Sequence, residues 1–207
     1  MKILNKKIPS NWSEVTIKQF QALSLIEYKD REITLDLIIE VMAALLEVSE
    51  EDINSLPFDV LNQINLDFLN QQPKELKYKK EIKVNDKKYE LMDNFNLMSM
   101  GEFYDLEAYI KEEEGSIMNM HKILSILYTP KKPFISKFKK KTRRKYDFIE
   151  TNKIADEFLD YMNMEQASTA IGFFLLGINH FMKITLDSLL KEKTRQMTEI
   201  SDSQKKN

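Results

Sequence analysis

The sequence predicts a mainly α-helical protein. Only four Gly and five Pro occur among the 207 residues, and hydrophobic residues make up 43% of the chain. Gly and Pro are the residues that disfavour helices most, and this hydrophobic content is enough to build a globular core. In addition, the stretches Val15–Leu23 and Met98–Leu106 look alike as helix starts. We therefore expect two pseudo-repeated αα units.

Each of these stretches combines a capping box with a hydrophobic staple. A Thr or Ser is followed three residues later by Gln or Glu, so that side chains and backbone N–H groups satisfy one another. An apolar residue precedes the cap, and a Phe lies four residues inside the helix. The residues are Val15, Thr16, Gln19 and Phe20 in the first copy, and Met98, Ser99, Glu102 and Phe103 in the second.

A partner helix follows each of these starts. Apolar residues recur at i, i+3, i+4 and i+7 over 37–45 and again over 119–127. This spacing is typical of one buried helix face. Two copies are too few for a solenoid, so the pattern indicates a pseudo-duplicated domain.

The predicted organisation has six segments. They are an N-terminal helical unit (1–73), a β-hairpin (74–94), a second αα unit (95–130), a basic connector (131–150), a C-terminal helical pair (151–195) and a flexible tail (196–207). Within them we expect helices over 17–28, 34–46, 57–70, 152–162 and 163–193, from caps and apolar periodicity.

The hairpin prediction rests on alternation of polar and apolar residues on both sides of Asn85-Asp86. An isolated hairpin is only marginally stable in water. The hairpin must therefore either pack on the helices through Ile82, Val84, Tyr89 and Leu91 or pair with a strand of another chain. Ile82, Val84 and Tyr89 are the candidate partner contacts. Trp12 has the same two interpretations: it anchors the N-terminal arm on the helices, or it contacts a partner.

Composition excludes several classes of protein. The chain has no Cys, so disulfides, thiolate nucleophiles and Cys-type zinc sites are excluded. The N-terminus lacks the apolar run of a signal peptide. The longest apolar run, near 170–178, is far shorter than the roughly 18 residues of a membrane span. We therefore expect no membrane contact.

No catalytic motif is present. The histidines, His121 and His180, lack metal-binding neighbours such as HExxH, and neither a phosphate loop nor a nucleophile elbow occurs. Glu112–Glu114 lacks the spacing of a calcium loop. The sequence thus predicts a protein that is not an enzyme and has no cofactor or metal. The alternative is an enzyme whose site gathers His121 or His180 with acids that are distant in sequence.

One segment is strongly basic. Nine Lys or Arg and no acid lie between residues 131 and 145, interleaved with aromatic residues. Such a segment either connects helices or contacts nucleic-acid phosphates without sequence preference. The residues are Lys131, Lys132, Lys137, Lys139, Lys140, Lys141, Arg143, Arg144 and Lys145.

A wider pattern spans Ile8–Pro130. IPSNWSEVTIKQFQALSLI, DVLNQINLDFLNQQP, KVNDKKYEL and NLMSMGEFYDLEAYI followed by KILSILYTP resemble proteins from structural-gene regions of tailed phages of gut bacteria, including crAss-like phages. The resemblance implies a virion or virion-assembly protein, such as a head–tail or tail ring subunit, an adaptor, a packaged protein or a tail-assembly chaperone.

The resemblance also implies partners and a location. The partners would be other virion proteins or further copies of this chain, and the location would be the host cytoplasm during assembly and the virion. It supplies no functional residues. The class to be weighed against it is a nucleic-acid-binding accessory protein that uses residues 131–145.

Overall fold

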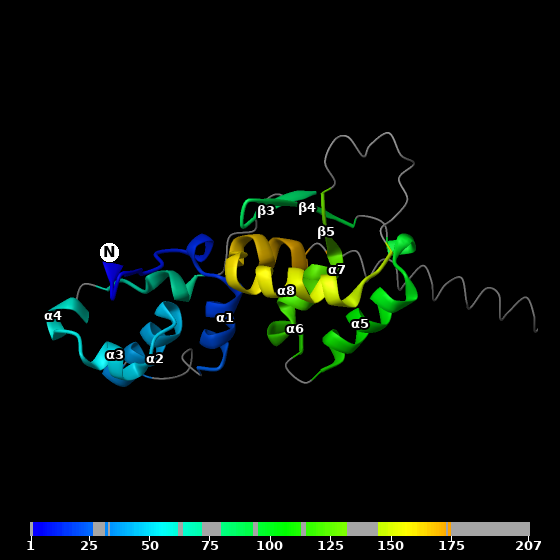
Figure 1. Ribbon diagram of the computed structural model, residues 1–207. Helices are drawn as coiled ribbons and strands as arrows, with labels where there is room; N and C mark the ends of the chain where they lie inside the picture. The colour runs from blue at the N-terminus through cyan, green and yellow to red at the C-terminus, as the bar shows by residue number, and fades with distance from the viewer. Residues whose placement is uncertain are drawn as a thin grey trace, which may run out of the picture. The chain divides into compact units, whose positions relative to one another are not determined.

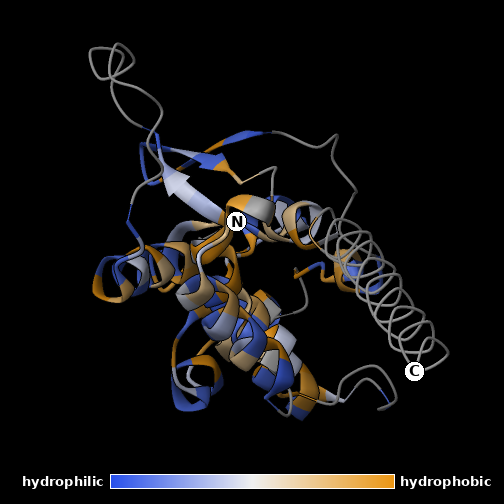
Figure 2. Ribbon diagram, turned by 90° about the vertical axis from the view of Figure 1, so that its right-hand side faces the viewer, coloured by the Kyte–Doolittle hydropathy of each residue, from blue (hydrophilic) through white to orange (hydrophobic). Residues whose placement is uncertain are grey.

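The computed structural model describes residues 2–26, 32, 34–61, 64–71, 80–92, 95–112, 115–131, 145–172 and 174. The protein is mainly helical, as predicted, and has a small three-stranded sheet (Figure 1). The chain divides into a unit of residues 1–170 and a second unit of residues 171–207. The elements below belong to the first unit. Hydrophobic and hydrophilic residues alternate along its helices (Figure 2).

The first two helices start as the sequence predicts. Helix α1 (Ile17–Ser24) begins at Thr16, whose side chain accepts from Gln19 N while Gln19 caps the Thr16 N–H. Helix α2 (Leu35–Leu46) is capped by Thr34. It ends at Glu47, whose left-handed φ of 50° turns the chain so that Val48 N donates back to Ala43 O at 3.1 Å. These local caps fix both helix starts.

The helix predicted over 57–70 is wrong. The chain forms α3 (Glu50–Asn54), α4 (Phe58–Leu61) and, after a non-helical stretch, a 3₁₀ turn over Asp67–Asn70. The side chain of Asn65 explains why the helix does not continue up to Asp67, because it accepts a hydrogen bond from Asp67 N at 2.8 Å. Such Asx turns give the backbone an alternative to the helix.

A first core surrounds α2. The N-terminal strands β1 (Lys2–Ile3) and β2 (Lys6–Lys7) pair antiparallel and carry apolar residues onto it. The apolar residues of α2 and α3 complete this cluster. Its buried members are Ile3, Ile8, Ile39, Met42, Ala43, Leu46 and Ile53.

The second helical unit also begins with the predicted capping box. Helix α5 (Met100–Lys111) starts at Ser99, and both halves of the Ser99–Glu102 box are present. The predicted partner helix forms as α7 (Met120–Leu127), and a separate short helix, α6 (Gly115–Met118), precedes it. The apolar stripe of α7 is buried, in agreement with its periodicity. Pseudo-repetition of the two units stays a prediction.

The hairpin forms with the expected turn. Strands β3 (Glu81–Val84) and β4 (Lys87–Leu91) pair around Asn85 and Asp86, which have φ of 44° and 62°. Positive φ at both positions is typical of a type I′ turn. The sequence did not predict the third strand, β5 (Tyr128–Pro130), which pairs with β4. The sheet order is β3-β4-β5, so the hairpin finds its third strand within this chain.

Helix α8 (Phe148–Tyr161) closes the second core. It begins at Asp147, so the basic connector ends three residues earlier than predicted. Helix α8 packs along α7, and the sheet lies against this pair (Figure 1). A further helix begins at Met164, as the cap at Asn163 predicts. Asn163 also forms an antiparallel bridge with Thr16.

No helix in the described ranges is long and apolar enough to cross a membrane. The predicted tail at 196–207 lies outside these ranges.

Candidate interaction surface

The hairpin side chains considered as partner contacts face the interior of this chain. Ile82, Val84 and Tyr89 are all buried. The Tyr89 ring packs edge-to-face on Phe158 of α8, with ring centroids 4.8 Å apart. Packing of the hairpin on the helices is thus confirmed. This corrects the alternative prediction that these three side chains contact a partner, because the core of their own chain already covers them.

An ion pair also attaches the hairpin to α8. Lys87 Nζ donates to Glu157 Oε2 at 2.5 Å, and the Glu157 side chain is only 11% exposed. Burial raises the pKa of the nearby Tyr89 phenol, and the negative charge of Glu157 raises it further. Tyr89 therefore keeps its proton and acts as a packing residue.

Trp12 is an anchor of the N-terminal arm. Its ring lies edge-on to Phe20 and Phe68, at centroid distances of 5.9 and 5.4 Å. Its Nε1 donates to the Gln71 carbonyl oxygen at 2.7 Å. This corrects the alternative prediction that Trp12 contacts a partner, because its side chain is buried within its own chain.

The structure describes only the two ends of the basic segment. Lys131 continues the sheet through its backbone N–H, which donates to Lys88 O at 2.8 Å, and its side chain forms an ion pair with Glu81. Lys145 is exposed. Lys131 is therefore engaged within the fold. The other seven basic residues lie outside the described residues: Lys132, Lys137, Lys139, Lys140, Lys141, Arg143 and Arg144.

His121 lies in a buried polar cluster between α1 and α7. Gln21 Nε2 donates to the carbonyl oxygens of Ile117 and Met118, at 3.1 and 2.8 Å, and lies 3.2 Å from His121 Nδ1. Burial lowers the pKa of His121 to about 4, with a smaller lowering from Lys122 and an opposing effect of Asp156. A neutral His121 accepts from Gln21, whereas a protonated ring would oppose one donor to another. His180 lies outside the described residues.

Acid is expected to destabilise the protein through His121. The unfolded chain takes up a proton near pH 6.5, whereas the folded chain does so only near pH 4. The stabilisation is therefore complete above pH 6.5 and is lost as the pH falls towards 4. Lowering the pH from 7.5 to 4.5 should cost about 2–3 kcal/mol of unfolding free energy through this group.

Urea unfolding of the wild type and of His121→Gln at both pH values measures this effect. The wild type should lose about 2–3 kcal/mol more than the variant. Equal losses in the two proteins would show that other groups cause the acid sensitivity.

A shallow groove lies between α1 and α2, and His121 does not line it. Its lining includes Lys18 and Glu47, which form an ion pair at 2.7 Å, together with three alanines. Among the residues that the structure describes, no group of three or more His, Asp or Glu is placed to hold a metal ion.

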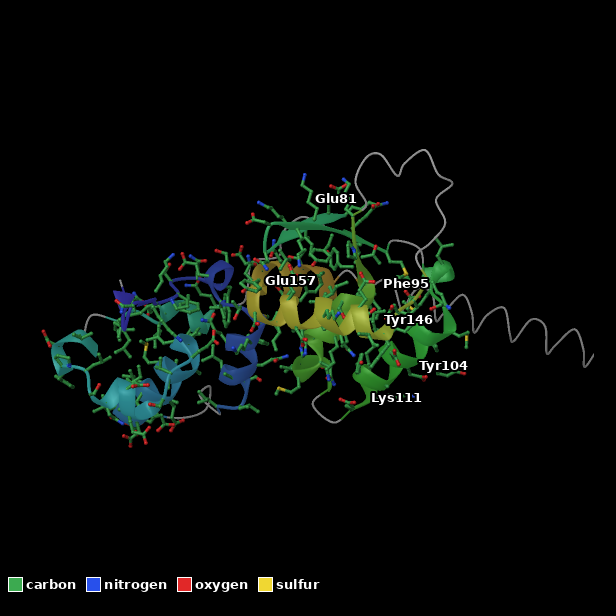
Figure 3. All side chains as sticks on the ribbon, in the orientation of Figure 1. Glu81, Phe95, Tyr104, Lys111, Tyr146 and Glu157 are labelled. Atoms are coloured by element: carbon green, nitrogen blue, oxygen red, sulfur yellow. The ribbon has the colours of Figure 1, made fainter. Side chains whose placement is uncertain are left out.

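The outer face of α5 is apolar and exposed. Leu97 precedes the helix and is 57% exposed, while Met100 and Tyr104 on the helix are 64% and 61% exposed. Ala108, also exposed, continues the row one turn further. Residues four apart share one side of a helix, and Tyr104 lies on the outer side of α5 (Figure 3). We call Leu97, Met100, Tyr104 and Ala108 the α5 outer surface.

The opposite face of α5 packs into the fold and positions this surface. Leu106 and Glu102 are buried there. Tyr146, just before α8, covers the helix start: its ring lies 3.1 Å from where a Cβ on Gly101 would stand, and its hydroxyl donates to Asp105. A helix that is apolar on two opposite faces is normally buried on both. The α5 outer surface is therefore the best candidate for a contact with another molecule.

The sequence contained the signal for this surface. Met100, Tyr104 and Ala108 recur every four residues, beside the inner apolar positions. The hydrophobic staple and the inner apolar positions Phe103 and Leu106 explain the helix by themselves, so the sequence pattern alone does not single out the outer row. Comparisons of the chain with protein-family models, curated proteins and solved structures found no match.

Proposed function

We propose that this chain is a structural or assembly protein of a tailed-phage particle that acts through protein–protein contacts. The observation that carries the proposal is the α5 outer surface. Large apolar side chains that are more than half exposed in one row are typical of interaction sites. The phage-like pattern over residues 8–130 supplies the biological setting.

The proposal includes the two αα units as a pseudo-repeat. The capping boxes at Thr16 and Ser99 support it, since both helices start with the same local geometry. In this arrangement the first αα unit holds the N-terminal arm, and the second αα unit presents the α5 outer surface. The protein would act in the host cytoplasm during assembly and in the virion as a ring, adaptor or packaged subunit.

Mass spectrometry of purified particles of a phage that encodes this chain tests the proposal. The chain should be present in particles, and Tyr104→Glu should reduce its incorporation. Tyr161→Glu is the matched control, because Tyr161 is 58% exposed but lies at the end of α8. Presence in infected cells without presence in particles would indicate an assembly chaperone. Failure to associate with virion proteins in either sample would refute the proposal.

A second candidate is non-specific binding of nucleic acid. The observation that favours it is the run of nine basic residues without an acid over 131–145. Contacts to phosphate release counterions, so binding of duplex DNA should weaken steeply with salt. A DNA shift that is lost when Lys139–Lys141 and Arg143–Arg144 are changed to Gln would support this candidate. Binding that is insensitive to salt would contradict it.

A further inference from the structure

We propose that the α5 outer surface binds the same surface of a second copy, with the two α5 helices antiparallel about a two-fold axis through Tyr104. This inference rests on the proposed function, since it names the partner of the surface assigned there. A two-fold contact requires a surface that is complementary to itself.

The size pattern of α5 meets this requirement. An antiparallel pairing centred on Tyr104 places Met100 of one helix opposite Ala108 of the other, and the same pair recurs across the axis. A long flexible side chain thus meets a small one, so Met100 can fill the space beside Ala108 on either side of the central Tyr104 pair. Leu97 falls opposite Lys111, whose methylene stem can cover it while the ammonium group reaches water.

The charges of α5 agree with the same pairing. Glu107 and Lys111 form an ion pair at 2.7 Å on the exposed side of the helix. In the proposed register Glu107 lies opposite Gly101 of the second copy, so neither charged residue meets a like charge. Gly101 is the position that Tyr146 covers, and the exposed Lys145 directly precedes Tyr146. The carboxylate of Glu107 can therefore approach Lys145 of the other copy, twice per dimer.

The apolar area of the α5 outer surface is small and predicts a weak interface. The three large side chains of the surface are 57% to 64% exposed, which leaves roughly 400 Å² of apolar surface per copy for side chains of about 200 Å² each. A dimer with the flanking stems would bury about 900 Å² in total, in the range of weak and transient interfaces. Because buried area alone does not fix the affinity, we take the dissociation constant of a weak complex, on the order of 10 µM, as the expected value.

Sedimentation of the full chain between about 1 and 200 µM tests the association, over a range that brackets the expected constant. The wild type should convert from monomer to dimer, and Tyr104→Glu should raise the dissociation constant at least tenfold, because it places two carboxylates on the axis. Tyr161→Glu should leave the constant unchanged. A wild type that stays monomeric at the highest concentration overturns the inference.

Disulfide cross-linking tests the register, since the natural chain has no Cys. Tyr104→Cys should give a covalent dimer on mild oxidation because the two positions meet at the axis. An equal mixture of Met100→Cys and Ala108→Cys should cross-link more than either variant alone. Lys153→Cys, exposed on α8, is the control. If Lys153→Cys cross-links as fast as Tyr104→Cys, the proposed pairing is overturned.

These outcomes separate the inference from the proposed function. A monomeric chain that is nevertheless found in particles, with incorporation reduced by Tyr104→Glu, would overturn the self-pairing and leave the surface as a contact for a different virion protein. Cross-linking of the dimer through Tyr104→Cys would support the pairing. If the same chain were absent from assembly intermediates in infected cells, this absence would count against the phage role.

Discussion

Replacing Phe158 with Ala is expected to lower the free energy of unfolding by about 4 kcal/mol. Phe158 is fully buried at the centre of the second core. Its ring contacts Tyr89 of the sheet edge-to-face and lies 6.3 Å from the ring of Tyr128. Removing a buried ring loses its transfer free energy and leaves a cavity, and Phe→Ala changes in cores cost about 3–5 kcal/mol.

Chemical denaturation of Phe158→Ala and of Tyr161→Ala measures this loss against a control on the same helix. Tyr161 is exposed, so its removal should change stability by less than about 1 kcal/mol. Because a typical domain is stable by only about 5–15 kcal/mol, the loss in Phe158→Ala should remove a large fraction of the total stability and lower the midpoint of denaturation clearly. Similar losses in the two variants would contradict the described core.

Replacing Trp12 with Ala is expected to cost about 3–5 kcal/mol. The change removes two edge-to-face ring contacts and the donor to Gln71 O. The arm that carries Trp12 also brings Ile3 and Ile8 onto α2, so the loss should extend to the first core. Hydrogen exchange of α2 amides, together with urea unfolding, measures the effect.

Trp12→Phe separates the ring contacts from the hydrogen bond. It keeps an aromatic ring between Phe20 and Phe68 and leaves the Gln71 carbonyl without its donor, so it should cost about 1–3 kcal/mol. If Trp12→Ala is no worse than an exposed substitution, the tryptophan serves a partner and does not anchor the arm.

Local interactions account for most of what the sequence predicted of the fold. The capping boxes at Thr16 and Ser99 join residues only three apart, so residue types reveal them directly. The Asn85-Asp86 turn is similarly local. Strand β5 was missed because its three residues carry no alternating pattern and end in Pro130. Only its distant partner β4 makes it a strand.

The site was harder to predict for a related reason. Alternating apolar residues in the hairpin indicate that one face is covered, and they do not tell whether the cover is Phe158 of the same chain or a partner. Trp12 posed the same ambiguity, which only the positions of Phe20 and Phe68 resolve. To predict the exposed row on α5, one must know which side of that helix faces the core. The burial of Leu106 gives this side, and it is known only from the structure.

The bridge between Thr16 and Asn163 has a consequence for synthesis of the protein. Ile17 N donates to Met162 O, and Met164 N donates to Val15 O, so the start of α1 is held by residues near the far end of the same unit. During translation these bonds cannot form until Met164 has left the ribosome. The backbone bridge at the start of α1 must therefore wait for almost the whole unit, and a C-terminal truncation before Met162 would leave the Ile17 N–H and the Val15 carbonyl without these partners.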